Sequence, residues 1–275
     1  MLTDYHMHLA QDGLPYDDDD FSLAHIGRYV ERAQAAGIEE IGFTDHVYRF
    51  RQAGGWFDHP LWQSAAVEDI DRYHAAVQGA REAGMPVRLG LEVDYLAGRE
   101  QPIAALVDRY RWDYLLGSVH WVDGLAIDWR RAPIWERYST EEVWRRYCDD
   151  LCAAAASGIY DSMAHPDLAK VFGQRPQPRP PALYRQIADA FQAAGVCAEV
   201  STAGYRRALG ELYPDPELLR MLHQRAVPVT LGSDAHAPDG VGRDFDRALA
   251  ELREAGYRTL TAFDARERRQ VAFDA

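Results

Sequence analysis

The chain has 275 residues, 47% of them hydrophobic, and a formal net charge of −13 at pH 7. This length and composition can bury a sizeable core and suit one large α/β domain or two small ones. The negative charge argues against a nucleic-acid-binding surface. No apolar run approaches the roughly 18 residues that a membrane span needs.

The start of the chain and the cysteine content both indicate the cellular compartment. The amino terminus lacks a basic stretch followed by an apolar run, so we expect no secretory signal. Cys148, Cys152 and Cys197 are a sparse, odd set, which favours reduced thiols over a disulfide framework. A metal pair formed by Cys148 and Cys152 is the alternative, but no second Cys or His pair accompanies them. We expect a cytoplasmic protein.

Five phrases repeat one pattern: an alanine-rich helical stretch, then Gly, then a short apolar run. They read AQAAGIEEIGF, AREAGMPVRLG, AAASGIYDSMA, FQAAGVCAEVS and LREAGYRTLTA. Glycine adopts the left-handed conformation cheaply and therefore ends helices well. Apolar side chains on both faces of a strand are typical of buried parallel strands. The pattern predicts alternating strands and helices.

The predicted elements follow in chain order. Strands are expected to begin near Leu2, Ile38, Pro86, Tyr114, Ile159, Val196 and Pro228, with one more candidate near Tyr257. Helices are expected near 22–36, 68–83, 101–110, 140–156, 181–194, 215–226 and 245–255. Ser139 and Glu142 fit a capping box for the fourth of these helices.

No linker or composition shift divides the chain. The alternation predicts a single domain over residues 1–275, a TIM-like (β/α) barrel of about seven units. A doubly wound open sheet is the alternative.

Six of the ten histidines fall at the carboxyl ends of predicted strands, as do three carboxylates. The residues are His6, His8, His46, His120, His165, His236, Glu92, Glu199 and Asp234. In a parallel barrel these ends form one face, where active sites are built. Alternation through Met7 turns His6 and His8 to one side of the first strand. Each residue alone would fit a structural hydrogen bond, but together they predict a metal centre.

The ligand types constrain the metal. Imidazole and carboxylate without thiolate suit zinc, manganese or iron. So many ligands indicate two or three ions, and Glu92 could bridge two of them. Clustered cations lower the pKa of a shared water and favour phosphate ester hydrolysis. By contrast, we expect His25, His74 and His223 to be solvated helix residues, and Asp17 to Asp20 to be an exposed loop or helix start.

The sequence segments that contain these histidines and carboxylates, taken in chain order, resemble the polymerase and histidinol phosphatase (PHP) superfamily. The resemblance covers nearly the whole chain. Its four core motifs are visible as HMH, TDH with the later Glu92, the HPD stretch and SDAH. Longer stretches resemble histidinol-phosphatases of the PHP type: LGLEVDY, GSVHWVDG, AHPDLAKVFG, EVSTAGYRR and VTLGSDAHAPDGVG.

The resemblance implies a distorted seven-stranded barrel with a trinuclear metal centre. The first ion would be held by His6, His8, Glu92 and Asp234. Glu92 would bridge to a second ion held by His120 and His165. The third ion would be held by His46, His236 and a residue of the loop after the first strand. Many relatives have a histidine in that loop, whereas here Asp12 is the best replacement, ahead of Asp17 to Asp20.

The implied reaction is direct hydrolysis of L-histidinol phosphate in histidine biosynthesis, by a bridging hydroxide and without a phosphoenzyme. Glu92, Asp234 and His236 would be the catalytic residues among the ligands. Asp45 and Asp167, next to ligand histidines, could orient imidazoles.

Four further residues are candidates for binding the substrate. Arg206, Arg207 and Lys170 could bind the phosphate, and Arg206 is favoured because a guanidinium makes bidentate contacts. Surface charge is the alternative for Arg207 and Lys170. Glu199 could support a metal ligand or bind a substrate amine.

Two other functions stay open. A PHP-type enzyme could act on another substrate, as a nucleotide phosphodiesterase, a nuclease or a phosphotyrosine phosphatase. A non-catalytic metal-binding module could keep the fold, although the near-complete ligand set argues against it.

Overall fold

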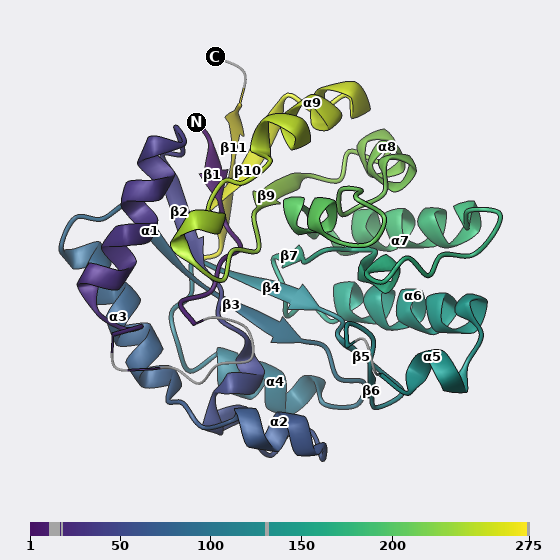
Figure 1. Cartoon of the computed structure of the whole chain (residues 1–275), viewed down its shortest axis with the longest axis horizontal. Coiled ribbons are helices and arrows are strands. Elements are labelled where there is room, and N and C mark those ends of the chain that lie inside the picture. Colours follow the sequence, from purple (N-terminus) through teal and green to yellow (C-terminus); the bar gives the residue numbers. More distant parts are fainter. Residues whose placement is uncertain (11–16, 18, 130–131, 274–275) are drawn as a thin grey trace.

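Seven parallel strands form a nearly closed barrel at the centre of the computed structural model, which describes residues 1–10, 17, 19–129 and 132–273 (Figure 1). In spatial order the strands are β1 (Thr3–Asp4), β2 (Glu40–Phe43), β3 (Val87–Asp94), β4 (Tyr114–Ser118), β7 (Ser162–Met163), β8 (Cys197–Ser201) and β9 (Val229–Gly232). The Tyr5 N–H donates to the Leu231 carbonyl over 3.0 Å, which joins the first strand to the last. The alternative of an open doubly wound sheet is therefore wrong.

Helices surround the barrel (Figure 1). The longer ones are α1 (Leu23–Ala35), α3 (Ile70–Glu82), α4 (Glu100–Val107), α6 (Thr140–Ala156), α7 (Pro181–Ala194), α8 (Pro216–Gln224) and α9 (Phe245–Ala255). All of these helices were predicted from the sequence. The Ser139 hydroxyl accepts a hydrogen bond from the Glu142 N–H at the start of α6, while the Glu142 carboxylate pairs with Arg145 and Arg146. Only the serine half of the predicted capping box is thus formed.

The glycines in the five repeated phrases have the predicted role. Gly37, Gly84, Gly158, Gly195 and Gly256 all have positive φ angles between 68° and 109°. Each lies between a helix and the next strand, where the chain reverses direction. A side chain would be strained in this conformation, so glycine is the residue that ends these helices.

Smaller elements in the loops were not predicted. They are the helices α2 (Pro60–Ala65) and α5 (Ile134–Arg137), and the hairpin of β5 (Trp121–Val122) and β6 (Leu125–Ala126). Short 3₁₀ turns also occur: η1 (Val47–Arg49), η2 (Arg51–Ala53), η3 (Leu168–Lys170), η4 (Thr202–Arg206) and η5 (Pro238–Gly240). Segments of two to six residues are too short to show a hydrophobic period, so the sequence does not reveal them.

The candidate strand near Tyr257 lies outside the barrel. It is β10 (Thr259–Asp264), which pairs with β11 (Glu267–Ala272) in an antiparallel hairpin. The hairpin covers the amino-terminal end of the barrel, because Asp264 pairs with Arg88 at the start of β3 and the Ala265 N–H donates to Asp113 just before β4. The opposite end, where the strands terminate, is left for a functional site.

Phe263 anchors this hairpin. Its buried ring stacks on Tyr114 at a centroid distance of 5.1 Å and meets the Tyr5 ring edge-on at 5.6 Å. Aromatic clusters of this kind bury large areas and prefer these offset and edge-on arrangements. The C-terminal segment therefore contributes directly to the barrel core.

Replacing Phe263 by Ala leaves a cavity in this cluster, so we expect the free energy of unfolding to fall by about 3–5 kcal/mol. Urea denaturation followed by tryptophan fluorescence measures the change. The matched control is Leu23→Ala, whose side chain is 47% exposed, with an expected change within about 0.5 kcal/mol. Equal, small losses for both variants would contradict the anchoring role of Phe263.

Candidate metal centre

Glu92 is the centre of a buried cluster of histidines at the carboxyl end of the barrel. Its Oε2 atom lies 2.7 Å from His46 Nδ1 and 3.3 Å from His6 Nε2. Its Oε1 atom lies 3.0 Å from His165 Nε2 and 3.5 Å from His120 Nε2. Glu92 is fully buried near the end of β3, so one carboxylate faces imidazoles from four different segments of the barrel.

Asp234 is the second carboxylate of the cluster. Its Oδ1 atom lies 3.3 Å from His8 Nε2, 3.6 Å from His6 Nε2 and 3.8 Å from His236 Nδ1. The backbone of Asp234 has a φ of +54°, and its N–H donates to the His6 carbonyl. The end of β9 is thereby fixed beside the end of β1, as the HMH and SDAH motifs require if they serve one site.

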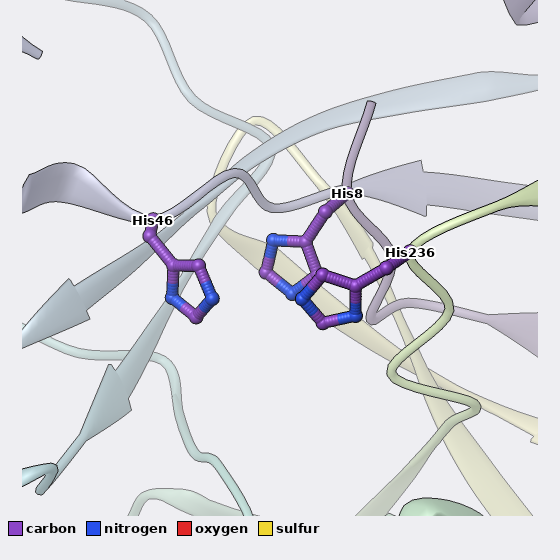
Figure 2. Close-up of side chains that lie close together, drawn as sticks. All are labelled: His8, His46 and His236. Atoms are coloured by element: carbon purple, nitrogen blue, oxygen red, sulfur yellow. The ribbon is translucent and has the colours of Figure 1, made fainter. Parts of the chain in front are cut away.

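A third group consists of imidazoles. Figure 2 shows His8, His46 and His236 with their rings turned toward one another. The His8 ring centroid lies 4.3 Å from that of His46 and 4.2 Å from that of His236. Asp12, the loop residue expected to complete this group, lies outside the described residues. Asp17 and Asp19 bind local groups ahead of α1, as expected of a helix start.

These donors fit metal ions. In four groups the ligand atoms lie within 4.8 Å of one another: His6–His8–Asp234, His6–Glu92–His165, His46–Glu92–His120 and His8–His46–His236. The buried ring nitrogens of His8 make no hydrogen bond of good geometry within the described part of the chain. Buried polar atoms without such bonds are costly, and a cation that accepts their lone pairs removes that cost. The cluster is therefore able to bind metal.

The electrostatics of the cluster also favour cations. Burial raises the pKa of Glu92, but the imidazoles of His46, His6 and His120 outweigh it and hold that pKa well below its usual range. Burial lowers the pKa of His120, but Asp94 and Glu92 reverse this and raise it to about 10. Without metal, protons therefore compensate the buried carboxylates. Metal ions would displace these protons, because an imidazole binds metal in its neutral form.

Two carboxylates behind the cluster orient its imidazoles. Glu199 on β8 lies 2.6 Å from His6 Nδ1 and accepts the backbone N–H of His165 over 2.7 Å. Asp94 lies 2.8 Å from His120 Nδ1. In both cases the partner nitrogen is the one turned away from Glu92, which leaves Nε2 to face the cluster. Carboxylates in this position fix the ring orientation and raise its basicity.

Gly232 makes room for the contact between Glu199 and His6. A Cβ at this position would lie 2.6 Å from His6 Cβ and closer still to Glu199 Oε1.

Asp94 was not predicted as a site residue from the sequence, although its spacing from Glu92 indicates such a role. Asp94 follows Glu92 by two residues, so both side chains project to the same face of β3.

The other orienting candidates have different partners. Asp45 accepts the Leu9 N–H, and Asp167 pairs with Lys170 and accepts the Asp215 N–H. These bonds fix loops next to ligand histidines. His25, expected to be solvated, is buried and lies 2.9 Å from the Leu9 carbonyl. That expectation was wrong because His25 is on the inward face of α1.

A cavity of about 610 Å³ opens over the cluster and is lined by His46, His120, His165, Asp234 and His236. Arg207 also lines this cavity. The structure thus brings one of the candidate phosphate-binding residues to the mouth of the metal centre.

The remaining substrate candidates point elsewhere. Arg206 donates to the carbonyls of Thr202 and Ser233, so it holds the chain just before Asp234 rather than facing the cavity over the cluster. Lys170 is buried and committed to Asp167 and the Leu212 carbonyl. Glu199 lies behind His6 and does not line the cavity. Arg206, Lys170 and Glu199 are thus engaged with protein groups, whereas Arg207 lines the cavity.

Comparison with known proteins agrees with this geometry. The PHP domain family model matches residues 5–203, and the chain belongs to the PHP domain family. Within that family it is similar to histidinol-phosphatases. A probable histidinol-phosphatase of Deinococcus radiodurans is 35% identical over 237 residues, which cover 85% of this chain and 88% of that protein. The Bacillus subtilis histidinol-phosphatase is 27% identical, over 82% of this chain and 91% of that protein.

A solved structure has the same fold. The crystal structure of histidinol phosphate phosphatase from Lactococcus lactis, complexed with zinc, L-histidinol and phosphate, superposes with a TM-score of 0.78. The alignment covers 98% of each chain at 20% sequence identity. A putative histidinol phosphatase from Listeria monocytogenes superposes with a TM-score of 0.72, over 89% of this chain and 99% of that one. The expected distorted (β/α) barrel is confirmed.

Replacing Glu199 by Gln removes the charge that holds His6, so we expect zinc affinity to fall about 10- to 100-fold. Competition with a chromophoric chelator measures the change. Glu267→Gln, at an exposed carboxylate on β11, is the control and should leave zinc affinity unaltered. Wild-type affinity in the Glu199 variant would show that the carboxylate has no orienting role.

Proposed function

We propose that this protein is a metal-dependent phosphatase that hydrolyses L-histidinol phosphate to L-histidinol and phosphate. One observation carries the proposal: the cavity over the histidine–carboxylate cluster is also lined by Arg207. An anionic ester can thus meet a metal centre and a positively charged side chain together. The relatives named histidinol-phosphatases support this substrate over other phosphate esters.

The proposed ligands follow the clusters and the family motifs. They are His6, His8, Glu92 and Asp234 for a first ion, Glu92, His120 and His165 for a second, and His46, His236 and Asp12 for a third. His8 also lies close to His46 and His236, the proposed ligands of the third ion. Two or three ions of zinc, manganese or iron suit this donor set.

When bound, such ions neutralise phosphate charge and lower the pKa of water. The protein's own residues prepare the site for that chemistry. Glu92 and Asp234 supply the negative charge that retains cations, and His236 presents an imidazole at the cavity surface. Glu199 and Asp94 keep the rings of His6 and His120 in their orientations. Arg207, which lines the cavity, would bind the phosphate oxygens and orient the ester over the cluster.

The remaining parts of the proposal concern organisation and location. We propose one domain over residues 1–275, because the C-terminal hairpin packs into the barrel core. Within the described ranges, no helix has the length and apolar character to cross a membrane. A cytoplasmic location is supported by the three free cysteines, which a reducing compartment maintains. The net charge of −13 favours a small-molecule substrate over nucleic acid.

Metal content and substrate preference test the proposal. Protein purified without chelator is expected to contain more than one equivalent of transition metal, measured by mass spectrometry. Its kcat/KM for L-histidinol phosphate should exceed that for phenyl phosphate, phosphotyrosine and a cyclic dinucleotide by about tenfold or more, a difference of about 1.4 kcal/mol in the barrier. Absence of metal would refute the metal centre, whereas equal rates on all esters would refute the substrate.

Alanine substitution separates the two arginines. Arg207→Ala should lower kcat/KM about 10- to 150-fold, since a hydrogen bond to a charged group contributes about 1.5–3 kcal/mol. Its metal content should be retained. Arg206→Ala removes the contact to the Ser233 carbonyl beside Asp234, so its metal content should fall. Steady-state kinetics and metal analysis of both variants provide the measurements, and the reverse pattern would assign the phosphate to Arg206.

A further inference from the structure

The cavity over the metal cluster contains a second charged group, of opposite sign to Arg207. Asp128 lines the same cavity and is exposed. It belongs to none of the four groups that could hold a metal. Its carboxylate makes no ion pair or hydrogen bond with another residue in the part of the chain that the structure describes. A carboxylate at the mouth of a site proposed to bind an anion needs an explanation.

Asp128 is held in place by the loop that carries it. The N–H of the preceding residue, Ile127, donates to the His120 carbonyl over 2.9 Å. The Ile127 carbonyl accepts the Trp135 indole N–H over 3.2 Å. These two bonds fix the backbone next to Asp128 on one side of the metal cluster. Asp128 and His120 line the same cavity, so this carboxylate adds negative charge beside the cluster.

Arg207 is its counterpart in the cavity. The Arg207 backbone N–H donates to the Gly204 carbonyl at the end of η4, and the side chain is exposed. Its guanidinium makes no ion pair with any described residue. The cavity therefore presents one cation and one anion to a ligand.

Aromatic side chains form the wall of this cavity. Tyr48, Trp62 and Trp121 line it, with ring centroids 5.8 Å apart for the first two and 6.3 Å apart for the last two. Trp129, directly after Asp128, is 49% exposed at the rim. A bare phosphate needs no such wall. A ligand with a planar group would bury these rings and gain the contacts that they offer.

We propose that Asp128 binds the ammonium group of the substrate's alcohol portion and is a specificity-determining residue. The substrate class is a phosphate monoester whose alcohol carries an amine and a planar ring. The inference rests on the proposed function, because L-histidinol phosphate has this combination: a phosphate for Arg207, an ammonium group for Asp128 and an imidazole for the aromatic wall.

The opposite charges of Asp128 and Arg207 explain how the site would select its substrate. An ester without an amine gains nothing from Asp128, and the carboxylate repels its phosphate. In an ester that carries an amine, the ammonium group would donate a charge-assisted hydrogen bond to the Asp128 carboxylate, which offsets the repulsion of the phosphate. The same group thus favours one substrate and disfavours its competitors, which is how a difference in affinity becomes specificity.

The experiment compares L-histidinol phosphate with its analogue that lacks the amine, 3-(imidazol-4-yl)propyl phosphate. The wild type should prefer the amine-bearing ester in kcat/KM by about tenfold or more. In Asp128→Asn this preference should collapse toward unity, mainly through a higher KM for L-histidinol phosphate. Asp108→Asn, at an exposed carboxylate after α4, is the matched control and should keep the wild-type ratio.

Binding measurements give a second readout that does not depend on turnover. Calorimetric titration of the metal-loaded protein with L-histidinol should show at least about tenfold weaker binding in Asp128→Asn. Inorganic phosphate should bind that variant no more weakly than it binds the wild type, because the substitution removes a negative charge. An unchanged amine preference together with unchanged L-histidinol affinity in Asp128→Asn would overturn the inference.

This design separates the inference from the proposed function. If the wild type hydrolyses L-histidinol phosphate in preference to phenyl phosphate and Asp128→Asn keeps the amine preference, the function stands and the role of Asp128 is refuted. If the wild type does not prefer L-histidinol phosphate, the proposed function fails. The role of Asp128 is then decided by tyramine phosphate against 4-ethylphenyl phosphate, which differ only in the amine. Loss of that difference in Asp128→Asn supports the inference, and its persistence refutes it.

Discussion

The buried carboxylate of Glu92 is the constraint around which the carboxyl end of the barrel is organised. A lone ionised carboxylate without water is very unfavourable, so its charge must be compensated by neighbours. Here the neighbours are imidazoles from several strand ends, among them His46 and His165, whose nitrogens lie 2.7 and 3.0 Å away. The arrangement surrounds one buried negative charge with nitrogen atoms that could also hold a metal ion. A cation at this position would compensate the charge of Glu92.

The two ends of the barrel differ in polarity and in their exposure to water. At the amino-terminal end the β10–β11 hairpin buries Phe263 against Tyr5 and Tyr114, which excludes water and contributes to the core. At the carboxyl end polar side chains replace apolar ones, and the cavity stays open. Stability and function are thus separated along the barrel axis, as in other barrels of this kind. Asp128 and Arg207 are both exposed at this open end, where they line the cavity.

Much of the fold and of the metal cluster could be predicted from the sequence, for identifiable reasons. Strand positions follow from apolar runs after glycines such as Gly195, whose positive φ ends a helix. The histidines and Glu92 were found because parallel strands end on one face, so residues far apart in the chain meet there. The small elements were missed because they have no period. Asp94 could have been found from its two-residue spacing to Glu92.

The sequence by itself determined the alternation of strands and helices, the residues at the strand ends and hence the presence of a metal-binding cluster. Only the tertiary structure decided which neighbours face the cavity. Arg206 and Arg207 are adjacent in the chain, yet one holds the carbonyl beside Asp234 and the other lines the site. Glu199 lies behind His6 because Gly232 leaves space for it. Strand residues alternate with a fixed period, whereas side chains beyond a strand end point where the irregular loop backbone directs them.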